Sequence, residues 1–312
     1  MILTVTMNPS VDMSYALPTF AMDQVNRCQN VRKTAGGKGL NVTRVIHQMG
    51  ESVKATGLLG GVLGTFIKEE LNQNDIAHAF SPIKGDTRNC IAVLHDGGKQ
   101  TEILEAGPTV SQEELIRFEN LLLEEAQQVD VITISGSLPK GAPVNFYADL
   151  LEKVEKLPVK VILDTSGESL EACLKSSVKP YGIKPNLEEL SSLLNQEVTL
   201  EEEDLKQVLS QELFCDIPLI LVSLGKDGAF AKYQEAFYRV SIPKVAVLNP
   251  VGSGDSTVAG LGIALKKGLA IEETLKTAMA LGILNAMESQ TGYVNPDKFE
   301  EIFKQIDVTI VD

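Results

Sequence analysis

Short apolar segments alternate with longer segments of helical periodicity through most of the chain. Residues 129–135 and 159–164 are typical of buried strands, and the capping-box sequence Ser111-Gln112-Glu113-Glu114 precedes apolar residues at helical spacing. Strands that alternate with helices predict a parallel sheet covered on both faces. The same pattern predicts further strands at residues 2–6, 55–59, 181–184, 219–223, 229–233, 237–240 and 246–248, and helices at residues 42–49, 64–73, 144–156, 168–175, 187–194, 258–265, 271–287 and 297–305.

Residues 86–106 have a different pattern, with β character and apolar side chains on both alternating faces. The turn sequence Asp96-Gly97-Gly98 predicts a hairpin within this segment. A small sheet with two apolar faces is not stable alone in water, so we expect one face to cover the active site and the other to meet a second subunit. The predicted organisation is an α/β nucleotide-binding core of residues 1–9, 36–85 and 107–312, with a β-sheet lid of residues 10–35 and 86–106.

The charge and composition of the chain limit the classes of partner and the cellular location that we expect. The 312 residues carry a formal net charge of −14, which argues against nucleic acid and anionic membranes as partners. No apolar run reaches the roughly 18 residues of a membrane helix, and residues 1–6 lack the pattern of a secretory signal. The four cysteines are far apart and the three histidines are scattered, so we expect reduced thiols, no metal cage of histidines and a cytoplasmic location.

The segment Asn249-Pro250-Val251-Gly252-Ser253-Gly254-Asp255 is the strongest candidate for catalysis. Its Gly-Ser-Gly turn leads into a helix, whose first backbone N–H groups and dipole favour an anion. A carboxylate at the same place, Asp255, can accept a proton from a hydroxyl group while those N–H groups stabilise a transferring phosphoryl group. The alternative interpretation is a glycine-rich turn with Asp255 as an ordinary residue of the first helical turn.

Polar stretches follow several of the predicted strands. In a parallel sheet, ligands bind beyond the carboxyl ends of the strands. Polar stretches gathered at one edge therefore predict a cleft large enough for a nucleotide and a second ligand. These stretches are Ser135-Gly136-Ser137, Asp164-Thr165-Ser166-Gly167, Lys184-Pro185-Asn186, residues 223–228 and residues 249–255.

Further candidates for binding each have a structural alternative. A helix start follows the segment Gly36-Gly37-Lys38-Gly39-Leu40-Asn41, which supplies accessible backbone N–H groups, a cation and an amide. These groups suit a polyol or a phosphate, but the same segment is also typical of a tight turn. Asn186 and Glu189 share one side of a first helical turn, where they could steer hydrated magnesium or form a capping box. Arg88 could bind a substrate phosphate from the lid or be an exposed strand charge.

Two common nucleotide-binding motifs are absent from the sequence. Lys38 is followed by Gly39 rather than by Ser or Thr, so the glycine-rich segment is not a Walker A motif. The first predicted strand is followed by Asn8-Pro9-Ser10-Val11-Asp12 rather than by G-x-G-x-x-G, which argues against a dinucleotide-dependent oxidoreductase.

Taken together, the motifs resemble those of the PfkB (ribokinase-like) family of sugar kinases along nearly the whole chain. Residues 35–42 are similar to its N-terminal signature, residues 249–255 to its C-terminal signature, and residues 184–189 carry its N-x-x-E motif. Residues 4–12 are similar to those of members that act on phosphorylated ketohexoses. Residues 87–92, 135–141 and 249–260 favour the branch that phosphorylates tagatose 6-phosphate in lactose and galactose catabolism. The branch that phosphorylates fructose 1-phosphate is the alternative.

The resemblance implies a three-layer α/β sandwich with a mostly parallel central sheet, a small β-sheet lid, and a homodimer joined through the lids. It also implies ATP and Mg²⁺, and some members of the family need a monovalent cation such as K⁺. A non-catalytic regulator with the same fold is the other alternative, but the intact Gly-x-Gly before Asp255 argues against it.

The resemblance also implies a role for individual residues. Asp255 would be the catalytic base, and the anion hole would be formed by Gly252, Ser253 and Gly254. Sugar hydroxyls would be bound by Asp12, Gly37 and Asn41, and the existing phosphate of the substrate by Lys38, Arg88 and Ser137. The nucleotide phosphates would be held by Lys184, Asn186 and Glu189, and magnesium by Asn186 and Glu189 through water. The rest of the ATP would be bound by Ser223, Gly225, Gly228 and Asn285, with Asn285 beside the adenine.

Overall fold

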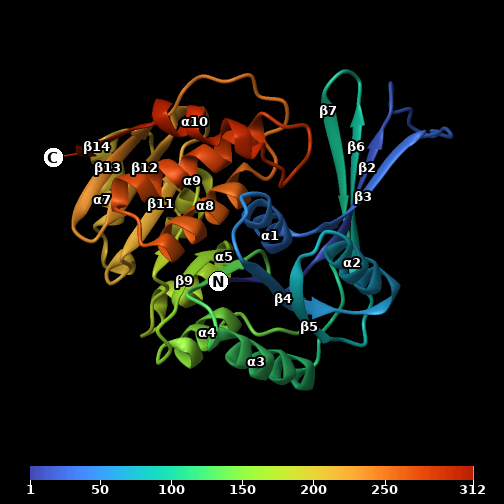
Figure 1. Ribbon diagram of the computed structural model, residues 1–312, viewed down its shortest axis with the longest axis horizontal. Helices are drawn as coiled ribbons and strands as arrows, with labels where there is room; N and C mark the ends of the chain where they lie inside the picture. Colours follow the sequence, from blue (N-terminus) through green and yellow to red (C-terminus); the bar gives the residue numbers. More distant parts are fainter. Residues whose placement is uncertain (312) are drawn as a thin grey trace.

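The larger of two β-sheets forms the centre of the molecule (Figure 1). The computed structural model describes residues 1–311, and within them this sheet has ten strands in the order β14-β13-β12-β11-β10-β9-β8-β1-β4-β5. Neighbouring strands from β5 to β11 are parallel, and those from β11 to β14 are antiparallel. The strands are β1 (Ile2–Thr6), β4 (Val53–Leu59), β5 (Ala77–Pro82), β8 (Val131–Ser135), β9 (Lys160–Asp164), β10 (Gly182–Ile183), β11 (Leu219–Ser223), β12 (Ala229–Tyr233), β13 (Ala236–Ser241) and β14 (Asp307–Val311).

Helices cover both faces of this sheet. They are α1 (Lys38–Gln48), α2 (Gly61–Gln73), α3 (Gln112–Ala126), α4 (Phe146–Val154), α5 (Gly167–Lys175), α6 (Leu187–Leu194), α7 (Glu202–Leu209), α8 (Ser253–Lys267), α9 (Ile271–Ala286) and α10 (Phe299–Gln305), with short 3₁₀ turns η1 (Glu212–Phe214), η2 (Gly225–Asp227) and η3 (Pro296–Lys298). None of the helices within residues 1–311 has the length and apolar character needed to cross a membrane.

The central strand β1 is buried at every position. Ile2 packs in the core formed with α1, α8 and α9, whereas Leu3 and Val5 pack in the core formed with α3, α4 and α5. Successive side chains of a strand point to opposite faces, so a sheet covered on both sides buries all of them. The expected three-layer α/β fold with a mostly parallel sheet is confirmed.

Helices α8 and α9 pack closely because glycines allow their backbones to approach. A Cβ atom at Gly260 would lie 2.5 Å from the Cα atom of Ala278, and one at Gly282 would lie 2.5 Å from Oγ1 of Thr257. Neither position has room for a side chain. Because α8 also packs on β8 and β9, its position relative to the sheet is fixed from two sides.

The second sheet is smaller and has the strand order β3-β2-β6-β7. It stands away from the large sheet in Figure 1, and only one end of it, which we call the root, lies against the body of the protein. At the root, Val11 and Ala35 pack in a core with Ile67 of α2, whereas Ile103 and Leu104 of the edge strand β7 are more than half exposed. The strands of this sheet are β2 (Ser10–Ala16), β3 (Asn30–Gly36), β6 (Arg88–His95) and β7 (Lys99–Leu104).

The predicted strand at residues 246–248 is wrong. Val247 and Leu248 are 57% and 69% exposed, and the segment lies outside both sheets. The backbone N–H groups of Leu248 and Asn249 donate to Ala286 O at the end of α9, at 2.8 and 3.2 Å. These bonds hold the segment against a helix end, so the Asn249–Asp255 motif follows a loop and not a strand.

The pattern of the sequence does not indicate β5 or β14, the two edge strands of the large sheet. Both strands contain several exposed or half-buried residues, because an edge strand has a neighbour on only one side. Such strands lack the continuous apolar run by which the central strands are predicted.

Candidate active site

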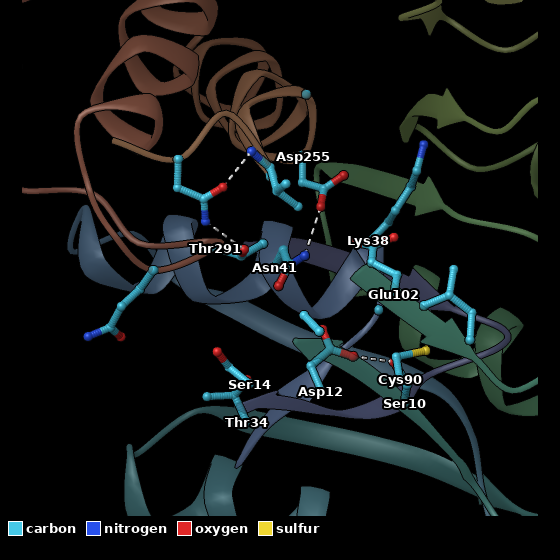
Figure 2. Close-up of a pocket in the computed structure, with 18 of the residues that line it drawn as sticks. Ser10, Asp12, Ser14, Thr34, Lys38, Asn41, Cys90, Glu102, Asp255 and Thr291 are labelled. Carbon is cyan, nitrogen blue, oxygen red and sulfur yellow. Dashed lines mark hydrogen bonds between the residues drawn. The ribbon is translucent and has the colours of Figure 1, made fainter. Parts of the chain in front are cut away.

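A cavity of about 570 Å³ lies between the small sheet, the first turns of α1 and α8, and the carboxyl ends of β9, β10 and β11. Figure 2 shows residues of both sheets and of the helices around it. The structure therefore brings together most of the residues predicted from distant parts of the sequence. Those lining the cavity are Asp12, Gly37, Lys38, Asn41, Arg88, Lys184, Asn186, Glu189, Ser223, Gly252, Gly254 and Asp255.

Asp255 lies in the first turn of α8 and faces this cavity although it is almost fully buried (Figure 2). Gly252 has a φ of 87°, a left-handed conformation that turns the loop into the helix and favours glycine. The N–H group of Ser253 donates to Pro250 O (3.2 Å). The N–H groups of Gly254 and Asp255 have no carbonyl group one turn earlier in the helix. The helix therefore presents backbone donors next to a carboxylate.

The neighbours of Asp255 have opposing effects on its charge. Burial raises the pKa of Asp255 to about 6, and the nearby carboxylate of Asp164 acts in the same direction. Lys38 and Lys184 lower the pKa, and Asn41 Nδ2 donates a hydrogen bond to Asp255 Oδ2 (2.8 Å; Figure 2). A carboxylate with a pKa near neutrality is suited to accept the proton of a hydroxyl group.

Asp164, at the end of β9, holds two lysines at the cavity. Lys38 Nζ and Lys184 Nζ each lie 3.3 Å from one of its carboxylate oxygens, and both Asp164 and Lys184 are buried. Burial raises the pKa of Asp164, but the two ammonium groups outweigh it and hold the pKa below its ordinary value. Lys184 Nζ also lies 3.4 Å from the Cβ position of Gly254, so positive charge adjoins the N-terminus of α8. This arrangement favours a phosphate group.

Asn186 and Glu189 form the capping box of α6 and also line the cavity. Asn186 Oδ1 accepts a hydrogen bond from the N–H group of Glu189 (2.8 Å), and the N–H group of Asn186 donates to Glu189 Oε2 (3.0 Å). The structural interpretation of this pair is therefore correct. The capping bonds also hold both side chains in place, and both line the same cavity as Lys184.

The small sheet contributes a second carboxylate to the opposite wall of the cavity. Asp12 of β2 accepts a hydrogen bond from Ser10 Oγ (2.6 Å; Figure 2). Asp12 pairs in register with Thr34 of β3 and with Cys90 of β6, so the three side chains share the face of the sheet that lines the cavity. Acceptor and donor groups on one wall suit a ligand with several hydroxyl groups.

A smaller cavity of about 220 Å³ adjoins the first and shares Gly37, Lys38 and Arg88 with it. It also includes Ser137, which follows β8. The cations at Lys38 and Arg88 and the surrounding polar atoms suit a small anion. The buried polar atoms around it that have no hydrogen-bond partner among the described residues are Thr6 Oγ1, Asn8 Oδ1, Ser135 Oγ and Arg88 Nε.

The sequence matches the family model described as pfkB family carbohydrate kinase over residues 5–298. The chain belongs to the PfkB family. A tagatose-6-phosphate kinase from Staphylococcus epidermidis is 55% identical to it over 308 residues, which cover 99% of each chain. The predicted family is thus confirmed, and its members are carbohydrate kinases.

Solved structures of this family share the fold. Phosphofructokinase-2 from Escherichia coli in complex with potassium is 29% identical, with a TM-score of 0.90 over 97% of this chain and 98% of that chain. The tetrameric inhibited form of the same enzyme has a TM-score of 0.88 at 29% identity and the same coverage. The ribokinase-like architecture predicted for this PfkB chain is confirmed.

Several residues predicted for the site of this PfkB chain lie outside the main cavity. Gly225 and Gly228 flank the turn η2, and a Cβ atom at Gly228 would lie 2.0 Å from Val240 O. Asn285 is fully buried: its Nδ2 donates to Val251 O (2.9 Å), and its Oδ1 accepts from the N–H group of Gly292 (2.8 Å). The structure therefore does not bring Asn285 to the cavity, and its amide holds the loop before α8.

The predicted set of site residues lacks Asp164, although the polar stretch after its strand is among the predicted cleft loops. The position of a carboxylate at the carboxyl end of a buried strand is the signal in the sequence. What the sequence does not indicate is that Lys38 and Lys184, from different elements, both lie against it.

Proposed function

We propose that this PfkB-family chain transfers the γ-phosphoryl group of ATP to the free primary hydroxyl group of tagatose 6-phosphate, which gives tagatose 1,6-bisphosphate. The observation that carries the proposal is one continuous site that joins Asp255, at a helix N-terminus, to a small cationic cavity. The first part suits the attack of a hydroxyl group on phosphorus, and the second suits the phosphate that the substrate already has. The 55% identity to a tagatose-6-phosphate kinase supports this choice of sugar.

In the proposed reaction Asp255 is the general base. Its carboxylate accepts the proton of the attacking hydroxyl group while the new oxygen–phosphorus bond forms and the bond from the γ-phosphorus to the bridging oxygen of ADP breaks. Of the anion hole expected at Gly252, Ser253 and Gly254, the N–H group of Ser253 already donates to Pro250 O. In this proposal the N–H groups of Gly254 and Asp255, with the ammonium group of Lys184, stabilise the negative charge on the transferring phosphoryl group. Because Asp255 is buried, these interactions act in surroundings of low polarity, where they are strong.

The acceptor sugar lies in this proposal between the large sheet and the small sheet. Its hydroxyl groups are bound by Asp12, Asn41 and the backbone at Gly37, and its 6-phosphate by Lys38, Arg88 and Ser137 in the smaller cavity. The unpartnered buried polar atoms around that cavity support this placement, because a bound phosphate gives such atoms hydrogen-bond partners.

We propose that the phosphates of ATP lie beside Lys184 and the remainder of the nucleotide near Ser223, Gly225 and Gly228. Asn186 and Glu189 supply oxygen atoms of the kind that Mg²⁺ prefers. No group of three His, Cys, Asp or Glu side chains in residues 1–311 is arranged to hold a metal ion, so these residues fit a hydrated ion held through water and the nucleotide. When bound, Mg²⁺ neutralises charge on the phosphate oxygens.

A need for K⁺ is part of the proposal only by likeness to phosphofructokinase-2 from Escherichia coli, which has been seen in complex with potassium. The need for K⁺ is tested by measuring the rate of sugar-phosphate phosphorylation in potassium chloride and in tetramethylammonium chloride at equal ionic strength. A rate that is equal in the two salts removes K⁺ from the proposal.

We propose that residues 10–35 and 86–106 act as a lid over the acceptor sugar and join two chains into a homodimer. Asp12 lies on the inner face of the small sheet, which supports the first role. Leu94 and Leu104 on the same face and Ile103 on the opposite face are exposed, and exposed apolar side chains that nothing covers are typical of an interface. The existence of a tetrameric form of a related enzyme shows that members of the family assemble.

The test of the proposed function is a comparison of kcat/KM for tagatose 6-phosphate, fructose 6-phosphate and fructose 1-phosphate with ATP and Mg²⁺. The first two differ at one stereocentre, and the third differs in the position of its phosphate. We expect tagatose 6-phosphate to have the highest kcat/KM. A higher value for fructose 1-phosphate would favour the alternative enzyme, and no turnover of any of the three would refute the proposal. Protein with Asp255→Asn, purified in the same way, is the control for contaminating kinases.

A further inference from the structure

Arg44 is a residue of α1 that none of the sequence motifs explains. It follows Asn41 by three positions, so the two side chains lie on the same side of the helix. Arg44 Nη1 donates to Asn41 Oδ1 (3.1 Å) and to Thr291 O (3.1 Å), and Arg44 Nη2 donates to Ala35 O. One guanidinium group therefore joins α1, the loop after α9 and the root of the small sheet.

The bond from Arg44 determines which way the amide of Asn41 faces. Because Asn41 Oδ1 accepts from Arg44, its Nδ2 is directed to Asp255 and donates to Oδ2 (2.8 Å; Figure 2). A reversed amide would place two oxygen atoms against each other at Asp255 and two donors against each other at Arg44. The orientation of Asn41 is thus fixed from both ends.

The surroundings of Arg44 leave space for this arrangement and hold it in place. Glu70 of α2 accepts a hydrogen bond from the N–H group of Ala35 (2.8 Å), so the peptide groups at Ala35 are held from α2 as well as from Arg44. A Cβ atom at Gly292 would lie 2.8 Å from Arg44 Nη1 and 3.0 Å from Asn41 Oδ1. Only glycine at that position leaves room for the bond between Arg44 and Asn41.

We propose that Arg44 is a positioning residue, which orients the amide of Asn41 so that it donates to Asp255 and ties this bond to the root of the small sheet. The role of Asp255 as the base rests on the proposed function. The effect of Arg44 on the carboxylate of Asp255 does not depend on it. In Arg44→Met the amide of Asn41 is free to rotate, and the ionised form of Asp255 loses a donor and a nearby positive charge. The other charged groups that face Asp255 stay in place: Asp164 at the end of β9, Lys38 on α1 and Lys184 after β10.

The first experiment measures Asp255 directly and needs no substrate. The carboxyl ¹³C resonance of Asp255, assigned by its absence in Asp255→Asn, is titrated in the wild-type chain, in Arg44→Met and in Arg44→Lys. We expect the titration midpoint in Arg44→Met to move to higher pH by roughly one unit, as the loss of one hydrogen bond to a charged group predicts. An unmoved midpoint in folded Arg44→Met would overturn the proposal, whichever sugar the enzyme uses.

The second experiment measures turnover in the same variants. In Arg44→Met we expect kcat to fall by about 10- to 100-fold with its acid limb at higher pH, and KM for ATP to stay within about twofold. Arg44→Lys keeps the charge but not the forked geometry and should recover part of the loss. Glu70→Leu is the matched control, because it removes the bond from the N–H group of Ala35 but does not touch Asn41. Equal pH profiles for Glu70→Leu and Arg44→Met would show that Arg44 acts only on the small sheet, which contradicts the proposal.

A double-substitution cycle separates a direct role from action through Asn41. If Arg44 acts through Asn41, Arg44→Met adds little to the loss of turnover already caused by Asn41→Ala. Additive losses would show that the two residues act independently, and the positioning role would then be wrong.

Discussion

At the scale of single residues, the ionisation of Asp255 depends on its immediate neighbours more than on the charge of the whole molecule. The chain has a formal net charge of −14, which disfavours a further negative charge on Asp255. Burial and the carboxylate of Asp164 also disfavour the ionised form of Asp255. Lys38, Lys184 and the amide of Asn41 oppose these effects from within hydrogen-bonding or short electrostatic range. Asp255, the proposed base, is therefore left with a pKa of about 6, close enough to neutrality for activity to depend on pH.

The pH dependence of kcat follows from this value. Only the ionised form of Asp255 can accept a proton, and a raised pKa means that this form is lost as the pH falls through about 6. We therefore expect kcat at saturating ATP and sugar phosphate to be nearly constant above pH 7 and to fall by about tenfold per pH unit below the pKa. A flat profile down to pH 5, in a chain shown to be folded by circular dichroism, would contradict the assignment of the base.

At the scale of elements, the N-terminus of α8 is placed by the packing of α8 against α9. At Gly260 the two backbones approach so closely that a Cβ atom would lie 2.5 Å from the Cα atom of Ala278. Gly262, on the same helix, is different, because a Cβ atom there would lie 3.4 Å from Cγ2 of Thr133, close to ordinary contact. The two glycines allow the packing to be tested separately from helix propensity.

Gly260→Ala should lower the free energy of unfolding by about 2 kcal/mol, because the added methyl group forces two helix backbones apart. Gly262→Ala is the matched control, and the higher helix propensity of alanine, about 1 kcal/mol, should make it neutral or stabilising. The midpoints of urea denaturation of the two variants and of the wild-type chain measure the difference. Equal midpoints for the two variants would show that α8 and α9 are less tightly packed than the structure indicates.

The elements that the sequence predicts are those whose signals are local. The helix start at Asp255, the capping box of Asn186 and Glu189, and the buried central strands each depend on neighbouring positions of the chain. The hydrogen bond between Asn41 and Asp255 joins residues 214 positions apart, and nothing in either motif indicates it. The same holds for the bond from Arg44 to Thr291 O and for the bond from Asn285 to Val251 O. Their roles depend on tertiary packing and can be assigned only from the structure.

At the scale of the whole molecule, the small sheet exposes several large apolar side chains. Leu94 and Leu104 are 39% and 60% exposed on the face that carries Asp12 and Cys90. The root is held by a core with α2, but the outer part has no cover within one chain. A second copy of the chain is the cover that we propose.

We expect light scattering at micromolar concentration to give the mass of two chains for the wild-type protein. The double variant Leu94→Asp, Leu104→Asp should give the mass of one chain, because carboxylates that would be buried in the interface oppose association. Val62→Asp is the control, since Val62 is equally apolar and 83% exposed but lies on α2 outside the small sheet. A wild-type chain that is monomeric at this concentration would remove the dimer from the proposal.

The two walls of the main cavity come from different sheets, and this has a consequence for how the family diversifies. Asp12, which we propose to bind the acceptor, belongs to the small sheet, whereas Asp255, Asp164 and Lys184 belong to the large sheet and its helices. Mutations in β2 and β6 can therefore alter one wall of the proposed sugar site without touching Asp255 or the lysines beside it. The small sheet is thus a place where relatives with different acceptors can diverge while this carboxylate and these cations stay the same.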